Sequence, residues 1–228
     1  MCKNFINVEK MEAYKKLVEG HKEFRKKYYG EEFEEYRSWA PKYQKPKVMV
    51  ISCSDSRINP AILTNSGLGE IFNVSNVANI VPPYRESCNT HHSTSSAIEY
   101  AVKHLKVEHI IVMGHSFCGG VNAMYTMEDR CETKSEEFSF INPWVDIISD
   151  IRDDVKSETP DEDLEGQLRL CEKKGVLVSI ENLKSFPFVK EAVDENRLGL
   201  HAWYFDLSDA SLYEYSEEKG EFEIFASD

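Results

Sequence analysis

The 228-residue sequence predicts an α/β fold in which a mainly parallel sheet is flanked by helices, with an N-terminal helical arm and C-terminal antiparallel strands. Three strand patterns support the sheet: KVMVIS, a short run rich in β-branched residues, a segment of GEIFNVSNVANIV, and HIIVMG. The first and third are apolar runs typical of buried strands. Helical patterns separate the runs, and this alternation implies right-handed crossovers between parallel strands. The tail alternates apolar and polar residues between turn residues, which indicates one further strand plus a hairpin.

The N-terminal region is predicted to be helical. Residues 9–29 place apolar side chains at helical spacing, and a second helical pattern, EEFEEYRSWA, ends before Pro41. We assign residues 1–40 to an N-terminal helical arm. An arm of this kind often packs on a partner subunit.

The central strands are predicted at 47–52, near 70–75 and at 109–114. A short helix or turn, INPAILTN, follows the first strand. The second strand is followed by a helix over 93–106, which begins with serine and threonine, residues that cap helix N-termini. After the third strand, GGVNAMYTM resumes as a helix.

The C-terminal region continues with helices and then strands. Helical patterns occur at 142–155, 161–175, 176–186 and 186–197. Strand patterns follow in LHAWYFDL, SLYEYS and EFEIF. No internal repeat, low-complexity tract or linker divides the sequence, so we expect a single domain over 1–228. It comprises the arm, an α/β core over 45–125, and a region of helices and C-terminal strands over 138–228.

Composition excludes several classes of protein. The net charge of −13 argues against a nucleic-acid partner and against binding to an anionic membrane surface. No run of about 18 apolar residues predicts a membrane span, and the N-terminus lacks the apolar region of a signal peptide, so we expect a cytoplasmic protein. The six cysteines lack the spacing of a small disulfide scaffold. We therefore expect them to be metal ligands, catalytic residues or core residues.

Two of the cysteines and one histidine point to a metal site. Cys53 follows the first strand, and the stretch GHSFCGG places His115 and Cys118 just after the third. Because the carboxyl ends of parallel strands form the ligand crevice of such sheets, the three side chains are expected to meet there. Cys, Cys and His suit tetrahedral Zn²⁺, and three protein ligands leave the fourth position that holds water in catalytic sites. The core over 45–125 is therefore a candidate zinc-binding region.

A carboxylate and a guanidinium accompany the first cysteine, since Asp55 lies two residues after Cys53 and Arg57 two residues further. We expect Asp55 to be either a fourth ligand or the acceptor of a hydrogen bond from the water of the site. Arg57 would hold this carboxylate away from the metal through a bidentate pair. Two thiolates cancel the zinc charge, so this water should be less acidic than in a three-histidine site, and activity should rise at alkaline pH.

Other interpretations of these residue types stay open at this point. A single cysteine at a strand end is more often a small buried apolar residue than a ligand, and only the addition of His115 and Cys118 favours a metal. The remaining histidines and cysteines lack such a context, and we interpret them as structural or exposed. GHSFCGG does not have the spacing of a phosphate-binding loop.

The motif C-S-D-S-R, followed about 60 residues later by G-H-S-x-C-G-G, resembles the β-class carbonic anhydrases. The stretches GEIFNVSNVANIVPPY, SAIEYAVKHLKVEHIIVMGHS, SIENLKSFPFVKEAV and LHAWYFDL are also similar to this family, so the resemblance covers about residues 40–208. It implies that Cys53, His115 and Cys118 bind zinc. It also implies two states of the Asp55–Arg57 dyad: a closed state with Asp55 on the metal, and an open state with Asp55 paired to Arg57.

The segment YQKPKVMVISC resembles the plant-type branch, in which a glutamine nine residues before the first zinc cysteine contacts the substrate. That residue is Gln44 here, and Phe72, Val77 and Tyr100 match the wall of the same pocket. In this family the neighbouring subunit supplies some of these residues. The resemblance therefore implies a homodimer or a higher homo-oligomer.

The sequence departs from the family pattern at two informative positions. Family members regulated by bicarbonate use an arginine and a tryptophan to form an inhibitory anion site, and these positions are Ser75 and Val50 here. We therefore expect no such bicarbonate switch. The stretch RESCNTHH is also longer than the common form.

The activity implied by the resemblance is the reversible, zinc-dependent hydration of carbon dioxide to bicarbonate and a proton. Carbon dioxide would lie against Phe72, Val77 and Tyr100, while Gln44 donates a hydrogen bond to a substrate oxygen and Asp55 orients the nucleophile. Two alternatives stay open: a related zinc hydrolase of carbon disulfide or carbonyl sulfide, and a non-catalytic zinc-binding scaffold or sensor. The scaffold would have a closed four-ligand site and no use for Gln44 or Arg57.

Overall fold

The computed structural model describes residues 12–30, 34–86, 92–126 and 140–224. Its contacts separate the chain into two compact units, Met1–Gln44 and Lys45–Asp228. This boundary lies a few residues beyond the predicted end of the arm at residue 40. The predicted single domain stays a prediction, and each unit is described by itself.

The N-terminal unit is helical, as expected from the spacing of its apolar residues. It contains α1 (Glu12–Tyr29) and α2 (Glu34–Trp39). No residue of α1 over its described length is buried within this chain, although the rings of Phe24 and Tyr28 pack against each other at 4.8 Å between centroids. Residues 9–11 of the predicted helix lie outside the described part. Packing of this arm on a partner subunit stays a prediction.

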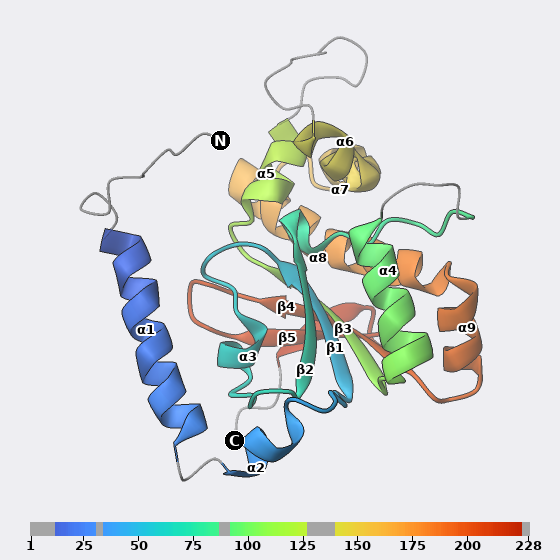
Figure 1. Cartoon of the computed structure of the whole chain (residues 1–228). Coiled ribbons are helices and arrows are strands. Elements are labelled where there is room, and N and C mark those ends of the chain that lie inside the picture. Colours follow the sequence, from blue (N-terminus) through green and yellow to red (C-terminus); the bar gives the residue numbers. More distant parts are fainter. Residues whose placement is uncertain (1–11, 31–33, 87–91, 127–139, 225–228) are drawn as a thin grey trace, which may run out of the picture. The chain divides into compact units, whose positions relative to one another are not determined.

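The second unit is built on one six-stranded sheet with the order β2-β1-β3-β4-β5-β6. The strands are β1 (Val48–Cys53), β2 (Ile71–Asn76), β3 (His109–His115), β4 (Gly199–Phe205), β5 (Leu212–Ser216) and β6 (Glu221–Ile224). β2, β1, β3 and β4 are parallel, whereas β5 and β6 pair antiparallel. The predicted fold class is therefore confirmed (Figure 1).

Helices connect and cover these strands. They are α3 (Pro60–Leu63), the 3₁₀ turn η3 (Val77–Asn79), α4 (Ser93–Glu99), the π-helix η4 (Tyr100–Leu105), α5 (Gly119–Thr126), α6 (Ile141–Val145), the 3₁₀ turn η6 (Asp146–Ile148), α7 (Asp150–Glu158), α8 (Leu164–Lys184) and α9 (Pro187–Asp194). The two patterns predicted at 161–175 and 176–186 are one helix, α8. Gly175 does not end it, because the buried Cys171, Val176 and Ile180 on either side outweigh the propensity cost of one glycine, about 1 kcal/mol.

The period-two alternation of β1 assigns its residues to two layers. Met49 and Ile51 belong to a core cluster shared with α4, α8 and α9, whereas Val50 packs on the other face with Ile58 and Ile111. Full burial of side chains of this size stabilises the fold by roughly 1.5–3 kcal/mol each. Among the described residues, no helix has the length and apolar character needed to cross a membrane.

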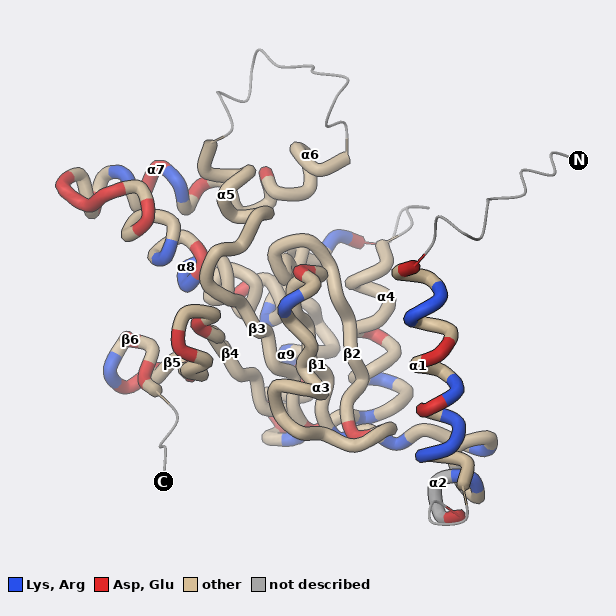
Figure 2. Tube along the Cα trace, turned by 90° about the vertical axis from the view of Figure 1, so that its left-hand side faces the viewer, with Lys and Arg blue, Asp and Glu red and all other residues tan. Residues whose placement is uncertain are grey.

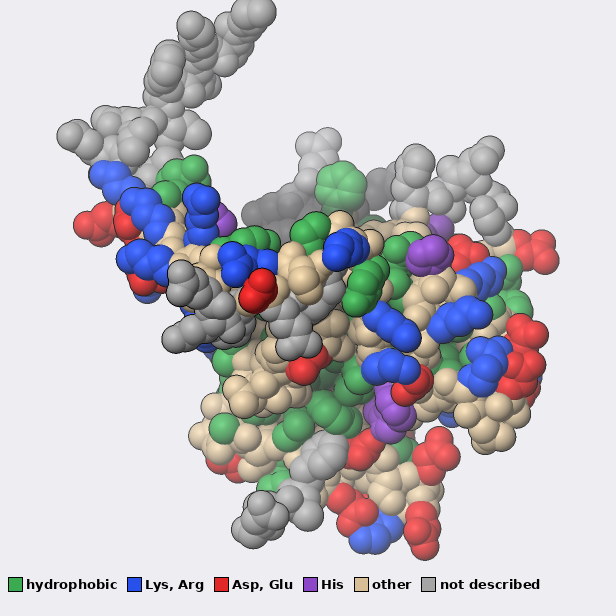
Figure 3. Space-filling model, turned by 60° about the horizontal axis from the view of Figure 1, so that its bottom comes forward, with side chains coloured by type: hydrophobic (Ala, Val, Ile, Leu, Met, Phe, Trp, Pro, Cys, Tyr) green, Lys and Arg blue, Asp and Glu red, His purple; other side chains and the backbone are tan. Residues whose placement is uncertain are grey.

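The carboxyl ends of β1 and β3 are capped by α5, α6, α7 and α8. A third cluster of buried residues lies there and includes both Cys53 and Cys118. Acidic residues gather along α7, one of these capping helices, and along the segment that leads into α8 (Figure 2). At the end where the strands begin, Lys and Arg lie beside Asp, Glu and His (Figure 3), as in the ion pair of Lys47 with Glu108. The capped end of the sheet therefore holds the two buried cysteines.

Candidate metal centre

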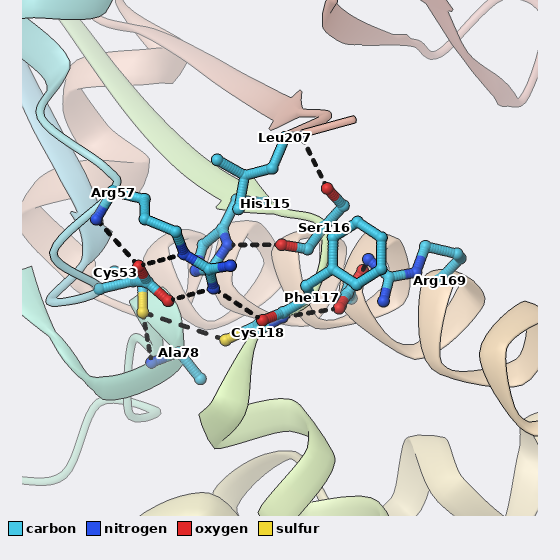
Figure 4. A network of polar contacts seen from close by, with 11 residues as sticks. Cys53, Arg57, Ala78, His115, Ser116, Phe117, Cys118, Arg169 and Leu207 are labelled. Atoms are coloured by element: carbon cyan, nitrogen blue, oxygen red, sulfur yellow. Dashed lines mark hydrogen bonds and ion pairs between the residues drawn. The ribbon is translucent and has the colours of Figure 1, made fainter. Parts of the chain in front are cut away.

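Three side chains of ligand type converge at the capped end of the sheet. Cys53 is the last residue of β1, His115 is the last residue of β3, and Cys118 immediately precedes α5. One ligand atom from each lies within 4.8 Å of the other two, and all three residues are buried. Parallel pairing of β1 with β3 produces this convergence, since both strands end at the same end of the sheet. Figure 4 shows the side chains of Cys53, His115 and Cys118 close together.

The histidine has one nitrogen available to a ligand. His115 Nδ1 lies 2.8 Å from the carbonyl oxygen of Ser116, an acceptor, so Nδ1 carries the proton and Nε2 carries the lone pair. Among the described residues, Nε2 is buried without a hydrogen-bond partner. A buried polar atom of this kind is costly unless something binds it, and a metal ion fits that requirement.

The two sulfurs have the separation that a tetrahedral ion requires. Cys53 Sγ and Cys118 Sγ are 3.9 Å apart. Two sulfurs bound at 2.3 Å with a tetrahedral angle would lie about 3.8 Å apart. Together with the free nitrogen of His115, this donor set fits Zn²⁺, whose preferred protein ligands are thiolate and imidazole.

The two thiols differ in acidity. The hydrogen bond between Cys118 and Cys53 lowers the pKa of Cys53 and raises the pKa of Cys118. The backbone N–H of Ala78 also donates to the Cys53 sulfur at 3.4 Å. Ala78 has a φ of 61°, a left-handed conformation that is strained for a residue with a side chain. The site is thus preorganised for at least one thiolate.

Asp55 and Arg57 form a bidentate ion pair beside this group. Arg57 Nε donates to Asp55 Oδ1 at 2.9 Å and Arg57 Nη2 donates to Asp55 Oδ2 at 2.7 Å. The backbone N–H of Arg57 adds a third bond to Oδ1 at 2.9 Å. These bonds with Arg57 hold the pKa of Asp55 well below its usual range. The structure therefore describes the open arrangement, in which Asp55 is an ionised acceptor and stands outside the metal-ligand group.

A buried carboxylate supports the Cys118 loop, and sequence reasoning missed it. Glu172 on α8 is 3% exposed, and its Oε1 accepts the backbone N–H of Cys118 at 2.9 Å. Its Oε2 accepts the hydroxyl of Tyr204 at 2.8 Å and pairs with Arg169 at 3.0 Å. Burial raises the pKa of Glu172. In the sequence this residue belongs to CEKK, a pattern that is indistinguishable from a solvated helix surface.

The predicted substrate residues do not all lie at this group within one chain. Val77 follows the end of β2, and Gly120 lies so close to it that a Cβ there would be 2.6 Å from Val77 Cγ1. Phe72 is four residues before Asn76, the register partner of Cys53, which corresponds to about 13 Å along the strand. The ring of Tyr100 lies next to Phe72, at 5.9 Å between centroids.

Gln44 is the last residue of the N-terminal unit. Contact of Gln44, Phe72, Val77 and Tyr100 with substrate therefore stays a prediction.

Ser75 occupies the position where the regulated family members carry arginine. Its hydroxyl lies 3.3 Å from that of Ser52 on the adjacent strand β1 and accepts a hydrogen bond from the Asn73 amide at 3.2 Å. Val50, the second of the two positions, is 2% exposed. The expected absence of a bicarbonate switch stays a prediction. Most of the longer stretch RESCNTHH lies outside the described residues.

Cys171 is a third buried cysteine, outside the ligand group, and its titration makes a testable contribution to stability. Burial, with a contribution from the Glu172 charge, raises its pKa from 9.0 to about 11. Between these values the folded chain holds a proton that the unfolded chain has lost, so the free energy of unfolding falls as pH rises. Cys171→Ala is expected to flatten this alkaline loss. Urea unfolding of the wild type and of Cys171→Ala from about pH 8 to about pH 11 measures this loss. If the free energy of unfolding falls equally steeply with pH in both proteins, the prediction is wrong.

The comparisons with known proteins agree with this geometry. A family model described as carbonic anhydrase matches residues 48–212. Beta carbonic anhydrase 3 of Arabidopsis thaliana is 38% identical over 202 residues, which is 88% of this chain and 76% of the relative. The chain belongs to the β-class carbonic anhydrase family. The plant-type resemblance is supported by a second Arabidopsis relative, the chloroplastic beta carbonic anhydrase 5, at 36% identity over 85% of this chain. This chain spans only 62% of that relative's length.

Solved structures of the family share the fold. The β-carbonic anhydrase CcaA superposes with a TM-score of 0.83 at 25% identity, covering 94% of this chain and 93% of that one. One of two tetrameric β-carbonic anhydrases from Sordaria macrospora superposes with a TM-score of 0.71 at 27% identity, covering 87% and 96% of the two chains. The mainly parallel sheet of this β-class carbonic anhydrase, with its antiparallel C-terminal strands, is thus the sheet of the family.

Proposed function

We propose that this chain catalyses the zinc-dependent, reversible hydration of carbon dioxide to bicarbonate and a proton. The observation that carries the proposal is the buried Cys53–His115–Cys118 group, whose His115 Nε2 has no partner among the described residues. Family membership supplies the reaction class. The Asp55–Arg57 pair supplies an ionised acceptor next to the group, which a purely structural zinc site does not need.

Each residue of the site has a separate task in this reaction. Cys53, His115 and Cys118 would hold the ion, and bound Zn²⁺ would supply the Lewis acidity that makes water a nucleophile. Asp55 accepts a hydrogen bond from the attacking water and thereby fixes the direction of its lone pair. Arg57 keeps Asp55 in place and ionised through three hydrogen bonds. The buried apolar cluster that includes Cys53 and Cys118 excludes bulk water from one side of the metal-ligand group.

The complete pocket is proposed to form between two copies of the chain. Phe72 and Tyr100 lie together about 13 Å along β2 from the register partner of Cys53, so they are better placed for a neighbouring subunit's site than for their own. Gln44 would join them as the donor to a substrate oxygen. The Sordaria macrospora relatives are described as tetrameric, which agrees with a homo-oligomer. A cytoplasmic location is proposed from the sequence alone.

Stopped-flow measurement of carbon dioxide hydration, with zinc content determined on the same sample, tests the function. At about pH 7 and about pH 9 we expect turnover that increases with pH and about one zinc ion per chain. Stoichiometric zinc without hydration at either pH would contradict the proposal. Carbon disulfide and carbonyl sulfide are then the next substrates to test.

The variant Asp55→Ala distinguishes the enzyme from the alternative, a non-catalytic zinc scaffold or sensor. In the enzyme, the variant is expected to retain about one zinc per chain and to lose hydration rate by about 100-fold or more, because the acceptor for the nucleophile is gone. In a scaffold with four protein ligands, the same change would weaken zinc binding. Zinc content and hydration rate, measured together, distinguish the two. Glu70→Ala, a change of carboxylate outside the group, is the control and should alter neither.

A further inference from the structure

One peptide group links the Asp55–Arg57 pair to the buried Glu172. Arg57 Nη2 donates to the carbonyl oxygen of Phe117 at 3.1 Å, and the N–H of the same peptide unit, that of Cys118, donates to Glu172 Oε1 at 2.9 Å. A cation at the oxygen end and a carboxylate at the N–H end both favour one orientation of the peptide dipole. The peptide is therefore clamped at both ends (Figure 4).

The residue that carries this carbonyl is strained and needs support. Phe117 has a φ of 58°, in the left-handed region that a residue with a side chain adopts only at a cost. Its ring is stacked on the Arg169 guanidinium, which lies 3.8 Å from the ring centroid. Arg169 is in turn fixed at its edge by the ion pair with Glu172 at 3.0 Å. Figure 4 shows Phe117 between Arg57 and Arg169.

We propose that Phe117 and Arg169 are positioning residues, whose stacking holds the Phe117 carbonyl where it keeps Arg57 on Asp55 and Asp55 away from the metal ligands. This inference rests on the proposed function for its catalytic consequence. Arg57 has two acceptors in fixed geometry, Asp55 and the Phe117 carbonyl. When the carbonyl turns away, Arg57 loses one of them, and the carboxylate is freer to move to the ion.

The test compares Phe117→Leu with Phe117→Tyr. Leucine has the same backbone strain but no aromatic face, whereas tyrosine keeps the ring. Besides activity, we would measure the affinity of the Co²⁺-substituted protein for thiocyanate by absorption spectroscopy. If Asp55 moved onto the metal, it would compete with this anion and lower the affinity. We expect about three- to tenfold weaker thiocyanate binding in Phe117→Leu and wild-type affinity in Phe117→Tyr. kcat for hydration at about pH 7 should fall by a similar factor, with KM less affected.

Three further variants extend the test. Arg169→Lys retains a charge for Glu172 but loses the flat stacking face, so it should also weaken thiocyanate binding. Lys156→Met removes a cation from the Tyr125 ring outside the site and should change nothing. In an Asp55→Ala background, Phe117→Leu should leave thiocyanate affinity unchanged, because the competing carboxylate is absent.

Crystal structures of the zinc-loaded proteins complete the test. In Phe117→Leu we expect Arg57 to leave the carbonyl of residue 117. Weaker thiocyanate binding that persists in the Asp55→Ala background would overturn the inference and assign Phe117 a merely structural role. Unchanged affinity in Phe117→Leu would overturn it as well. An inactive wild-type enzyme would instead refute the proposed function, while anion affinity and crystal geometry would still test the positioning role.

Discussion

Replacing Cys53 by serine is expected to remove both the bound metal and the hydration activity. A serine hydroxyl is a poor zinc ligand at neutral pH, and the remaining His115 and Cys118 would form only a two-residue site. Zinc content should fall from about one ion per chain to near zero after dialysis. Hydration rates should then match those of buffer alone. Elemental analysis and stopped-flow assay of one sample measure both effects.

The chain offers a matched control for this change. Cys171→Ser makes the same substitution at a buried cysteine outside the ligand group. It buries a hydroxyl and should cost about 1–3 kcal/mol of stability, but zinc content and turnover should survive in the folded protein. Full zinc content in Cys53→Ser would contradict the assignment of this residue as a ligand. Loss of zinc in both variants would show that global unfolding, and not ligation, is being measured.

The strands of the core were predictable because their signal is local. The observed β1, β2 and β3 begin and end within about one residue of the predicted 47–52, 70–75 and 109–114. β1 and β3 are β-branched apolar runs that two layers of core bury, whereas no residue of β2 is fully buried. The convergence of Cys53, His115 and Cys118 follows from the parallel pairing of two such strands, so the sequence also contained the ligand group.

The supporting residues of the site were not predictable in this way. Glu172 is a charged residue in a charged stretch of α8, and only the three-dimensional packing decides that it is buried against Cys118. The stacking of Phe117 on Arg169 joins positions 52 residues apart in the chain, with no pattern to connect them. The π-helix at Tyr100–Leu105 was also missed, since a helical pattern does not specify which hydrogen bonds form.

Strand register bears on the predicted pocket, whose contact with substrate stays a prediction. Phe72 and Tyr100 pack together, but register assigns Phe72 to the level of Met49 and not to that of Cys53. A resemblance assigns residues to a pocket without saying which copy of the chain supplies them. Strand register adds that Phe72 lies about 13 Å along β2 from the level of Cys53, which supports the proposal that two copies of the chain form the pocket.

Removing the Glu172 carboxylate is expected to lower both the stability of the fold and the affinity for zinc. After the loss of a zinc ligand, this is the second largest effect that we expect from a single substitution. Glu172→Ala would leave the N–H of Cys118, the hydroxyl of Tyr204 and the Arg169 charge without their shared acceptor. Loss of one partner of a buried ion pair costs about 3–5 kcal/mol, which corresponds to a fall in melting temperature of about 10 °C for a chain of this size. Denaturant and thermal unfolding of the metal-free protein measure it.

Glu172→Gln separates the contribution of this residue to stability from its contribution to zinc affinity. The amide keeps the shape and one oxygen acceptor for the Cys118 N–H, so the loss of stability should be smaller than in Glu172→Ala. Zinc affinity, measured by competition with a chelator, should still fall about 10- to 100-fold, as is usual when a group that orients a metal ligand is changed. Glu181→Gln, at an exposed glutamate of the same helix that pairs with Lys184, should change neither quantity appreciably. If zinc affinity in Glu172→Gln equals that of the wild type while stability falls, Glu172 stabilises the fold of α8 against β4 without orienting the Cys118 loop toward the ion.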